Sequence, residues 1–251
     1  MTGIRADQLV ADRGLAESRT RAQALILAGL VFSGDRRIDK AGQPLAPDAP
    51  LTVKGRDHPW VSRGGLKLDH ALAHLGWDVT GATAIDVGAS TGGFTDVLLS
   101  RGCARVYAVD VGHGQLAWKL REDSRVVVLE RMNARALTRE QVPEPVDLVV
   151  CDASFIALAK VLPAALSLAC RGARLVALVK PQFEAERGEV GKGGVVRDPE
   201  IHARVCTQAA DWLTGEGWHV ADLVRSPITG PEGNVEFLIG AVAGEPAQDG
   251  G

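Results

Sequence analysis

The sequence predicts an α/β protein in which a small α+β module precedes a larger, seven-stranded sheet. After residue 60, short and nearly continuous apolar runs alternate with helical segments, which is typical of a parallel sheet covered on both faces. The length of 251 residues suits two unequal domains. Charge is also unevenly divided, because residues 1–67 carry 11 Lys and Arg against 7 Asp and Glu, whereas residues 68–251 carry 17 against 24. A basic module attached to an acidic one is therefore expected.

The amino-terminal module is predicted to contain two helices and three strands. Apolar residues recur at helical spacing over residues 5–14 and 18–29, and a serine is placed to cap the second helix. Residues 31–32 and 36–38 flank a Ser-Gly-Asp turn and predict a hairpin. Residues 51–53 predict a third strand.

The second module is predicted to begin with a helix over residues 62–76. Trp60 lies in the short segment before it, and we expect its ring to pack at the domain interface. Apolar runs then predict the strands of the sheet, and the last two runs, which a Pro/Gly-rich turn separates, are expected to pair antiparallel. These runs are residues 84–87, 106–109, 126–129, 148–150, 175–179, 218–224 and 235–239.

The composition excludes several classes of protein. Hydrophobic residues make up 46% and charged residues 24%, as in folded soluble chains. No apolar run approaches the length of about 18 residues that a membrane-spanning helix needs, and the amino terminus lacks the layout of a signal peptide. The four cysteines are widely spaced, and no histidines lie at ligand spacing, which argues against a zinc site or a disulfide framework. We therefore expect a cytoplasmic protein with no metal and no membrane partner.

Arginines gather on one helix start and one hairpin of the amino-terminal module. Guanidinium groups fork onto phosphate oxygens, which is the chemistry of RNA backbone binding. Together with the spacing of Gly14-Leu15, Ser18-Arg19 and Leu25-Ile26, this pattern resembles the S4 RNA-binding domain, in which leucine is common where Ala6 stands here. The alternative is that the arginines form only a solvated face. The residues expected to contact RNA are Arg5, Arg19, Arg21, Arg36, Arg37 and Arg63.

A glycine-rich segment follows the first predicted strand of the sheet. Residues 86–95 read Asp-Val-Gly-Ala-Ser-Thr-Gly-Gly-Phe-Thr and precede a helix, at the place where open α/β folds bind cofactors. Their spacing differs from the dinucleotide and P-loop motifs, which argues against a pyrophosphate or a triphosphate. The carboxylate of Asp86 suits the sulfonium ligand S-adenosylmethionine, which has no phosphate. The alternative is a purely structural turn.

Polar residues also follow the next two strands. Asp110 comes directly after residues 106–109, where a carboxylate can accept hydrogen bonds from both ribose hydroxyls of a nucleoside. Asn133 lies just past the third strand and is expected to bind the adenine amino group, although either residue could be only a helix cap. The residues expected to bind the cofactor are Asp86, Gly88, Ala89, Ser90, Gly92, Gly93, Phe94, Asp110, Val111, Asn133 and Asp152.

A second group of charged residues is scattered through the sequence. Asp152 and Lys180 end the fourth and fifth predicted strands, so we expect them side by side at the sheet edge that holds the glycine-rich loop. Lys67 precedes the first strand, and Glu236 lies in the last predicted strand. Burial penalises an ammonium, so a lysine directly after an apolar strand is an unusual choice for packing. These four residues resemble, in order and context, the Lys-Asp-Lys-Glu tetrad of the FtsJ-like ribose 2′-O-methyltransferases. A surface cluster of salt bridges is the alternative.

The whole chain resembles the TlyA family, in which an S4 domain is fused to an FtsJ-like methyltransferase with the Rossmann-like, class I sheet. This resemblance implies domains at residues 1–58 and 64–243, a linker at 59–63 and a tail at 244–251. It also implies S-adenosylmethionine as the cofactor and ribosomal RNA in ribosomal subunits as the partner. The reaction it implies is methylation of a cytidine ribose 2′-hydroxyl in 23S and, in some members, 16S ribosomal RNA.

The reaction needs a base and close alignment, because a ribose hydroxyl is a poor nucleophile whereas a sulfonium methyl group is already activated. Lys180 is the predicted base, which requires its neutral form. Lys67 is expected to stay charged and to hold the hydroxyl oxygen, while Asp152 and Glu236 orient both amines.

Residues 181–199, rich in glycine and charge, form a long connection and are expected to be a loop that orders over the RNA, with a disordered insertion as the alternative.

Three other functions compete with this interpretation. A non-catalytic RNA-binding assembly factor would retain the fold without turnover, and the complete tetrad argues against it. Members of the TlyA family have also been labelled haemolysins, but the sequence contains no apolar span adequate for a pore. A dehydrogenase is disfavoured because the dinucleotide glycine spacing is absent.

Overall fold

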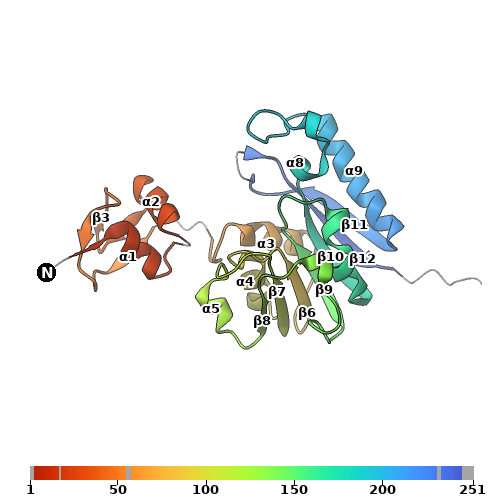
Figure 1. Cartoon of the computed structure of the whole chain (residues 1–251), viewed down its shortest axis with the longest axis horizontal. Helices are drawn as coiled ribbons and strands as arrows, with labels where there is room; N and C mark the ends of the chain where they lie inside the picture. The colour runs from red at the N-terminus through yellow and green to blue at the C-terminus, as the bar shows by residue number, and fades with distance from the viewer. Residues whose placement is uncertain (1–2, 17, 55–57, 231–232, 245–251) are drawn as a thin grey trace, which may run out of the picture. The chain divides into compact units, whose positions relative to one another are not determined.

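The structure is a computed structural model, and it describes residues 3–16, 18–54, 58–230 and 233–244 (Figure 1). The chain forms two compact units that divide between Pro59 and Trp60, within the segment predicted as the linker. Of the predicted tail, residues 245–251 lie outside the described residues. No helix in the described part of the chain is long and apolar enough to cross a membrane.

The first unit contains the two predicted helices and the three predicted strands. The three strands form a sheet in the order β3-β2-β5. A second sheet of two short strands, β1 and β4, was not predicted, because strands of two residues leave no periodic pattern in the sequence. The elements are β1 (Ile4–Arg5), α1 (Ala6–Asp12), α2 (Arg19–Leu27), β2 (Val31–Ser33), β3 (Arg36–Arg37), β4 (Pro44–Leu45) and β5 (Leu51–Val53).

Local contacts explain how α1 and α2 are held. Ser18 caps α2, because its Oγ accepts a hydrogen bond from the backbone N–H of Arg21 at 3.1 Å. Asp7, in the first turn of α1, is fully buried, and its Oδ2 lies 2.9 Å from Arg5 Nη2 and 3.0 Å from Arg19 Nε. The hydrogen bond from Arg5 holds the pKa of the Asp7 carboxyl well below its ordinary value. Asp7 therefore joins β1 and α2 around one buried carboxylate.

The second unit contains the predicted seven-stranded sheet, in the order β11-β12-β10-β9-β6-β7-β8 (Figure 1). Strands β6 to β10 are parallel, and β12 runs antiparallel between β10 and β11. The prediction of a class I methyltransferase sheet is confirmed. The strands are β6 (Thr83–Val87), β7 (Arg105–Val109), β8 (Val126–Leu129), β9 (Val146–Cys151), β10 (Ala169–Val179), β11 (Trp218–Arg225) and β12 (Phe237–Ala243).

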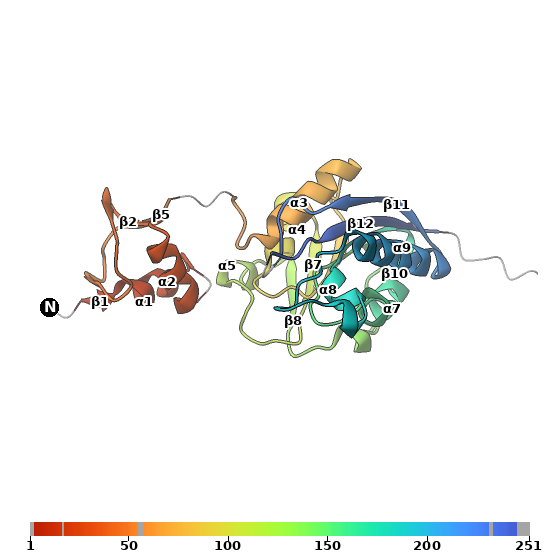
Figure 2. The same ribbon diagram turned by 90° about the horizontal axis from the view of Figure 1, so that it is seen from above.

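Helices cover both faces of this sheet, as the apolar strands predicted (Figure 2). Along β9, Leu148 and Val150 pack into one core, while Val149 and Cys151 pack into the core on the other face. The first core is covered by α3 (Gly64–Leu75), α4 (Gly93–Ser100) and α5 (Trp118–Arg121). The second is covered by α6 (Leu158–Val161), α7 (Pro163–Ser167) and α9 (Pro199–Gly215).

Residues 181–199 contain regular structure, and their expected ordering over the RNA stays a prediction. They contain α8 (Pro181–Glu184), the 3-10 turn η2 (Arg187–Glu189), a β-bridge between Gly191 and Val195 and the start of α9. Asn234 fastens this segment to the loop before β12, because its Oδ1 accepts from Val196 N at 3.1 Å and its Nδ2 donates to Gly194 O at 3.0 Å. Composition could not predict the order of this segment, because a distant asparagine supplies these bonds.

Trp60 packs within the second unit. A Cβ atom placed on Gly65 would lie 2.3 Å from Cγ of the tryptophan ring, so the ring lies directly against the first turn of α3. Trp60 is also packed against the core beneath α3 and α4. Packing of Trp60 against the first unit stays a prediction.

Candidate active site

The sheet brings the predicted site residues to one edge. Asp110, Asp152 and Lys180 directly follow the parallel strands β7, β9 and β10, so all three lie at the carboxyl edge. Glu236 precedes β12 instead of lying within the last strand, which corrects the prediction. It reaches the same edge because β12 is antiparallel to β10 and Phe237 lies opposite Val179.

The two lysines and two acids form one connected cluster. Lys67 Nζ, on α3, lies 2.6 Å from Glu236 Oε2 and 3.6 Å from Asp152 Oδ2. Lys180 Nζ lies 2.6 Å from Asp152 Oδ1. Asp152 thus holds one lysine on each of its carboxylate oxygens, and the cluster forms a chain from Glu236 to Lys180.

This cluster is not a set of surface salt bridges. The side chains of Lys67, Lys180 and Glu236 are 9%, 7% and 0% exposed, whereas that of Asp152 is 21% exposed. Burying charges is costly, and removing one partner from a buried pair leaves an uncompensated charge. The arrangement therefore keeps two amines and two carboxyl groups together, and opens the cluster to solvent mainly at Asp152.

Glycine makes room for the Glu236 side chain. A Cβ atom at Gly230 would lie 2.1 Å from Glu236 Oε1, so even alanine there would displace the carboxylate. Gly230 belongs to the loop between β11 and β12, and its backbone N–H donates to Asn234 O at 2.9 Å. This loop therefore sets the position of one end of the cluster.

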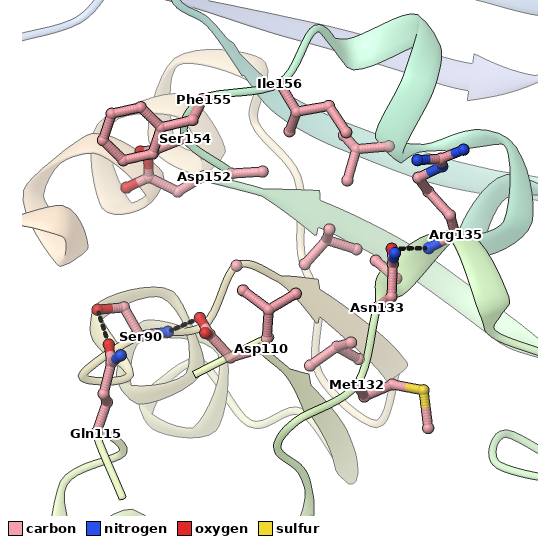
Figure 3. A pocket seen from close by; sticks show the side chains of 17 residues that line it. Ser90, Asp110, Gln115, Met132, Asn133, Arg135, Asp152, Ser154, Phe155 and Ile156 are labelled. Atoms are coloured by element: carbon pink, nitrogen blue, oxygen red, sulfur yellow. Dashed lines mark hydrogen bonds between the residues drawn. The ribbon is translucent and has the colours of Figure 1, made fainter. Parts of the chain in front are cut away.

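A cavity of about 500 Å³ adjoins the cluster (Figure 3). Asp152 lines it together with the loops that follow β6, β7 and β8, so Asp152 belongs both to the cavity and to the cluster. Of the residues expected to bind the cofactor, Gly88, Ser90, Asp110, Val111, Asn133 and Asp152 line the cavity.

The loop that follows β6 depends on the backbone geometry of a glycine. Gly88 has φ +82°, and a Cβ atom there would lie 2.9 Å from Ala153 Cα, so only glycine allows the close approach of the two strand ends. The Asp110 carboxylate accepts from Ser90 N at 2.8 Å and from Gly112 N at 2.7 Å. Asp110 therefore holds together the two loops that form one wall of the cavity.

Asp86, Ala89, Gly92, Gly93 and Phe94 are not among the cavity-lining residues. Asp86 is fully buried, and its Oδ2 accepts from Thr95 N at 2.9 Å and from Thr95 Oγ1 at 2.7 Å. Burial raises the pKa of the Asp86 carboxyl to about 7, and the negative charge of Asp152 adds to this effect. The structure thus places Asp86 behind the loop, where it fixes the first turn of α4.

Asn133 combines both interpretations that its sequence position allowed. Its side chain lines the cavity, and its Oδ1 accepts from Arg135 N at 3.1 Å, which caps the 3-10 turn η1 (Ala134–Ala136) (Figure 3). Apolar side chains of Met132, Ile156 and Val161 line the cavity as well. Among the residues that the structure describes, no group of three or more acidic, His or Cys side chains is placed to hold a metal ion.

Sequence reasoning missed two residues next to the cluster. Lys180 Nζ donates to Ser154 Oγ at 3.0 Å and to the Asp152 backbone carbonyl at 3.1 Å. Phe155 is 89% exposed, has φ +66°, and its ring centroid lies 5.0 Å from that of Phe183. Their position directly after Asp152 could have indicated both residues, because residues at the carboxyl end of a parallel strand lie beside the site.

The arginines expected to contact RNA divide into two groups. Arg5 and Arg19 pair with the buried Asp7, and Arg37 Nε lies 2.7 Å from Asp39 Oδ1. All six arginines are exposed, but Arg21, Arg36 and Arg63 form no ion pair with another described residue. Arg63 belongs to the second unit, where it precedes α3. The structure therefore does not gather all six arginines on one unit.

Comparisons with known proteins match a different family to each of the two units. Residues 60–242 match the FtsJ-like methyltransferase family, and residues 4–50 match the S4 domain. The chain is 50% identical to the 16S/23S rRNA (cytidine-2′-O)-methyltransferase TlyA of Mycobacterium tuberculosis, with 94% of this chain and 88% of that protein covered. It is 39% identical to Hemolysin A of Brachyspira hyodysenteriae, over 94% of this chain and 98% of that protein. A solved structure from Streptococcus thermophilus, named as a hemolysin, covers 98% of this chain and 90% of its own, at 42% identity and a TM-score of 0.78.

Proposed function

The chain belongs to the TlyA family, which joins an S4 domain to an FtsJ-like methyltransferase domain, and we propose that it transfers a methyl group from S-adenosylmethionine to the 2′-hydroxyl of a cytidine ribose in ribosomal RNA. One observation carries this proposal: Asp152 lines a cavity suited to a nucleoside and also binds both buried lysines. The reacting groups would then meet beside Asp152. The TlyA relative from M. tuberculosis is named as a 16S/23S rRNA (cytidine-2′-O)-methyltransferase, which supports the same substrate.

The cavity suits S-adenosylmethionine, which supplies an activated methyl group on a sulfonium. A carboxylate at Asp110 is the acceptor that ribose hydroxyls require. The apolar side chains of Met132, Ile156 and Val161 offer surface to a purine ring, and Asn133 offers a polar group beside them. The carboxylates of Asp110 and Asp152, which line the cavity, favour a cationic ligand. Acidic Asp110 and Asp152 also disfavour a phosphate, which agrees with the absence of a phosphate-binding motif.

The cluster supports Lys180 as the base. Lys67 contacts two carboxylates, Glu236 and Asp152. Lys180 pairs with the single carboxylate of Asp152 and otherwise contacts two neutral oxygens. Neutral Lys180 would accept the proton of the ribose hydroxyl while charged Lys67 stabilises the developing negative charge on its oxygen.

Two exposed features would bring RNA to this site. The S4 unit carries the exposed arginines Arg21 and Arg36, which suit phosphate oxygens. The exposed ring of Phe155, next to the cluster, offers a stacking surface to the base of the target nucleotide. Methylation within ribosomal subunits would place the protein in the cytoplasm.

A methyl-transfer assay on isolated large and small ribosomal subunits, with radiolabelled S-adenosylmethionine, tests the proposal. The wild-type protein is expected to label RNA of at least one subunit. Lys180→Ala is expected to keep its affinity for S-adenosylmethionine and to lose at least about 100-fold in methyl-transfer rate, because general-base catalysis contributes on that order.

Lys160→Ala is the matched control, because Lys160 is an exposed lysine on α6. It is expected to keep wild-type activity. Absence of labelling by the wild-type protein on both subunits would contradict the proposed function, and near-normal turnover by Lys180→Ala would remove Lys180 from the role of base.

A further inference from the structure

The amino group of Lys180 has three oxygen neighbours of two chemical kinds. Asp152 Oδ1, at 2.6 Å, and the Asp152 backbone carbonyl oxygen, at 3.1 Å, can only accept hydrogen bonds. Ser154 Oγ, at 3.0 Å, can accept or donate, because a hydroxyl does both. The three contacts therefore do not constrain the amine in the same way.

A neutral amine has two N–H bonds and one lone pair. If Lys180 is neutral, its two N–H bonds satisfy the two oxygens of Asp152 that only accept. The lone pair is then left for the remaining neighbour, and the hydroxyl of Ser154 can donate to it. The lone pair is the part of the amine that takes a proton, so its direction decides whether Lys180 can act as a base.

Ser154 also marks the open side of the buried lysine. The Lys180 side chain is only 7% exposed, whereas Ser154 is exposed and lines the cavity together with Asp152. A lone pair directed at Ser154 Oγ therefore points to the side from which a ribose hydroxyl can enter. A lone pair directed at Asp152 would face acceptor oxygens and could take no proton.

We propose that Ser154 is a positioning residue for methyl transfer, which holds the lone pair of neutral Lys180 towards the substrate side until the ribose hydroxyl replaces it as the donor. This inference rests on the proposed function. On methyl transfer, the 2′-oxygen would form a bond to the methyl carbon of S-adenosylmethionine as the bond between that carbon and the sulfonium sulfur breaks, which leaves S-adenosylhomocysteine, and the hydroxyl proton would pass to the Lys180 lone pair. The resulting ammonium retains Asp152 as an acceptor on two sides and later releases the proton to water.

The test compares Ser154→Thr with Ser154→Val, because these side chains have nearly the same shape and differ in the hydroxyl group. Single-turnover methyl transfer to ribosomal subunits is measured over a range of subunit and S-adenosylmethionine concentrations. Ser154→Thr is expected to keep the limiting rate constant within about twofold of wild type, whereas Ser154→Val loses about fivefold, the effect of one neutral hydrogen bond. The concentrations for half-maximal rate are expected to stay unchanged in both variants.

Equal limiting rate constants for the Thr and Val variants would overturn the inference. A loss in Ser154→Val that appears only as a higher half-saturating concentration would also overturn it, because Ser154 would then contact substrate without acting through Lys180. Both results require an active wild-type protein, so they are distinct from failure of the proposed function, in which wild type itself transfers no methyl group.

Discussion

Single charged residues do most to define this site, and their burial separates two roles. Asp152 is partly exposed, lines the cavity and touches both lysines of the cluster. Asp86 is fully buried and holds Thr95 at the start of α4. Both residues were expected from the sequence to bind the cofactor, but only tertiary contacts show which of the two carboxylates faces the cavity.

Stability is expected to depend on pH through Asp86. Burial raises the pKa of its carboxyl from 3.8 to about 7, so the folded protein keeps this proton in a pH range where the unfolded chain has lost it. Asp86 therefore makes the free energy of unfolding fall as pH rises from about 4 to about 7, by about 1.4 kcal/mol for each unit of pKa shift.

Asp86→Asn tests this dependence, because the amide oxygen can still accept from Thr95 and cannot ionise. Chemical denaturation between pH 4 and pH 8 is expected to show that the variant gains stability relative to wild type as pH rises. Parallel stability curves for the two proteins would contradict a buried, titrating Asp86.

At the scale of the structural elements, the ends of three parallel strands place three of the site residues. Parallel strands predicted from apolar runs correctly brought Asp110, Asp152 and Lys180 to one sheet edge. Glu236 reaches the same edge because it directly precedes the antiparallel strand β12, which begins at Phe237. The apolar run in the sequence could not locate the start of that strand. The regular structure within residues 181–199 could not be predicted from the local sequence, because Asn234, which is distant in the chain, supplies two of the hydrogen bonds that hold this segment.

The loop between β11 and β12 is expected to control activity through Gly230. Gly230→Ala requires no unusual backbone angle, but its Cβ would lie 2.1 Å from Glu236 Oε1 and would force the carboxylate away from Lys67. Methyl-transfer activity is expected to fall by about tenfold or more, since a displaced charged partner costs at least about 1.4 kcal/mol.

The control for this variant is Gly215→Ala, at the end of α9, where a Cβ would meet no atom within 4 Å. Activity assays and circular dichroism on both variants separate the two possible effects. Equal activity of Gly230→Ala and Gly215→Ala would show that Glu236 has no part in the reaction.

Across the whole molecule, positive and negative charges are unevenly distributed along the chain. Residues 1–67 have an excess of positive charge and residues 68–251 an excess of negative charge, a difference already visible in the sequence. Which arginines are available to RNA was not visible there, because the pairing of Arg5 and Arg19 with Asp7 depends on folding. Arg5 and Arg19 are exposed as well, but Arg21 and Arg36 form no ion pair with a described residue and are therefore the better candidates for phosphate contacts within the S4 unit.

Arg21→Gln combined with Arg36→Gln is expected to weaken binding to ribosomal subunits. Each lost phosphate contact reduces the dependence of log affinity on log salt concentration by about 0.7 to 0.9. The rate of methyl transfer at saturating subunit concentration is expected to stay the same, because neither arginine belongs to the cluster. Arg225→Gln, which removes an exposed charge from β11, is the control. An unchanged salt dependence in the double variant would exclude both arginines from RNA binding.

We propose that the cluster of Lys67, Asp152, Lys180 and Glu236 activates a ribose hydroxyl for methylation. Mass spectrometry of nucleosides from treated ribosomal subunits tests it most directly, because it locates the methyl group on the base or on the sugar. The account predicts 2′-O-methylcytidine with the wild-type protein and none with Lys180→Ala. A methyl group on a nucleobase, or 2′-O-methylcytidine formed equally well by Lys180→Ala, would contradict it.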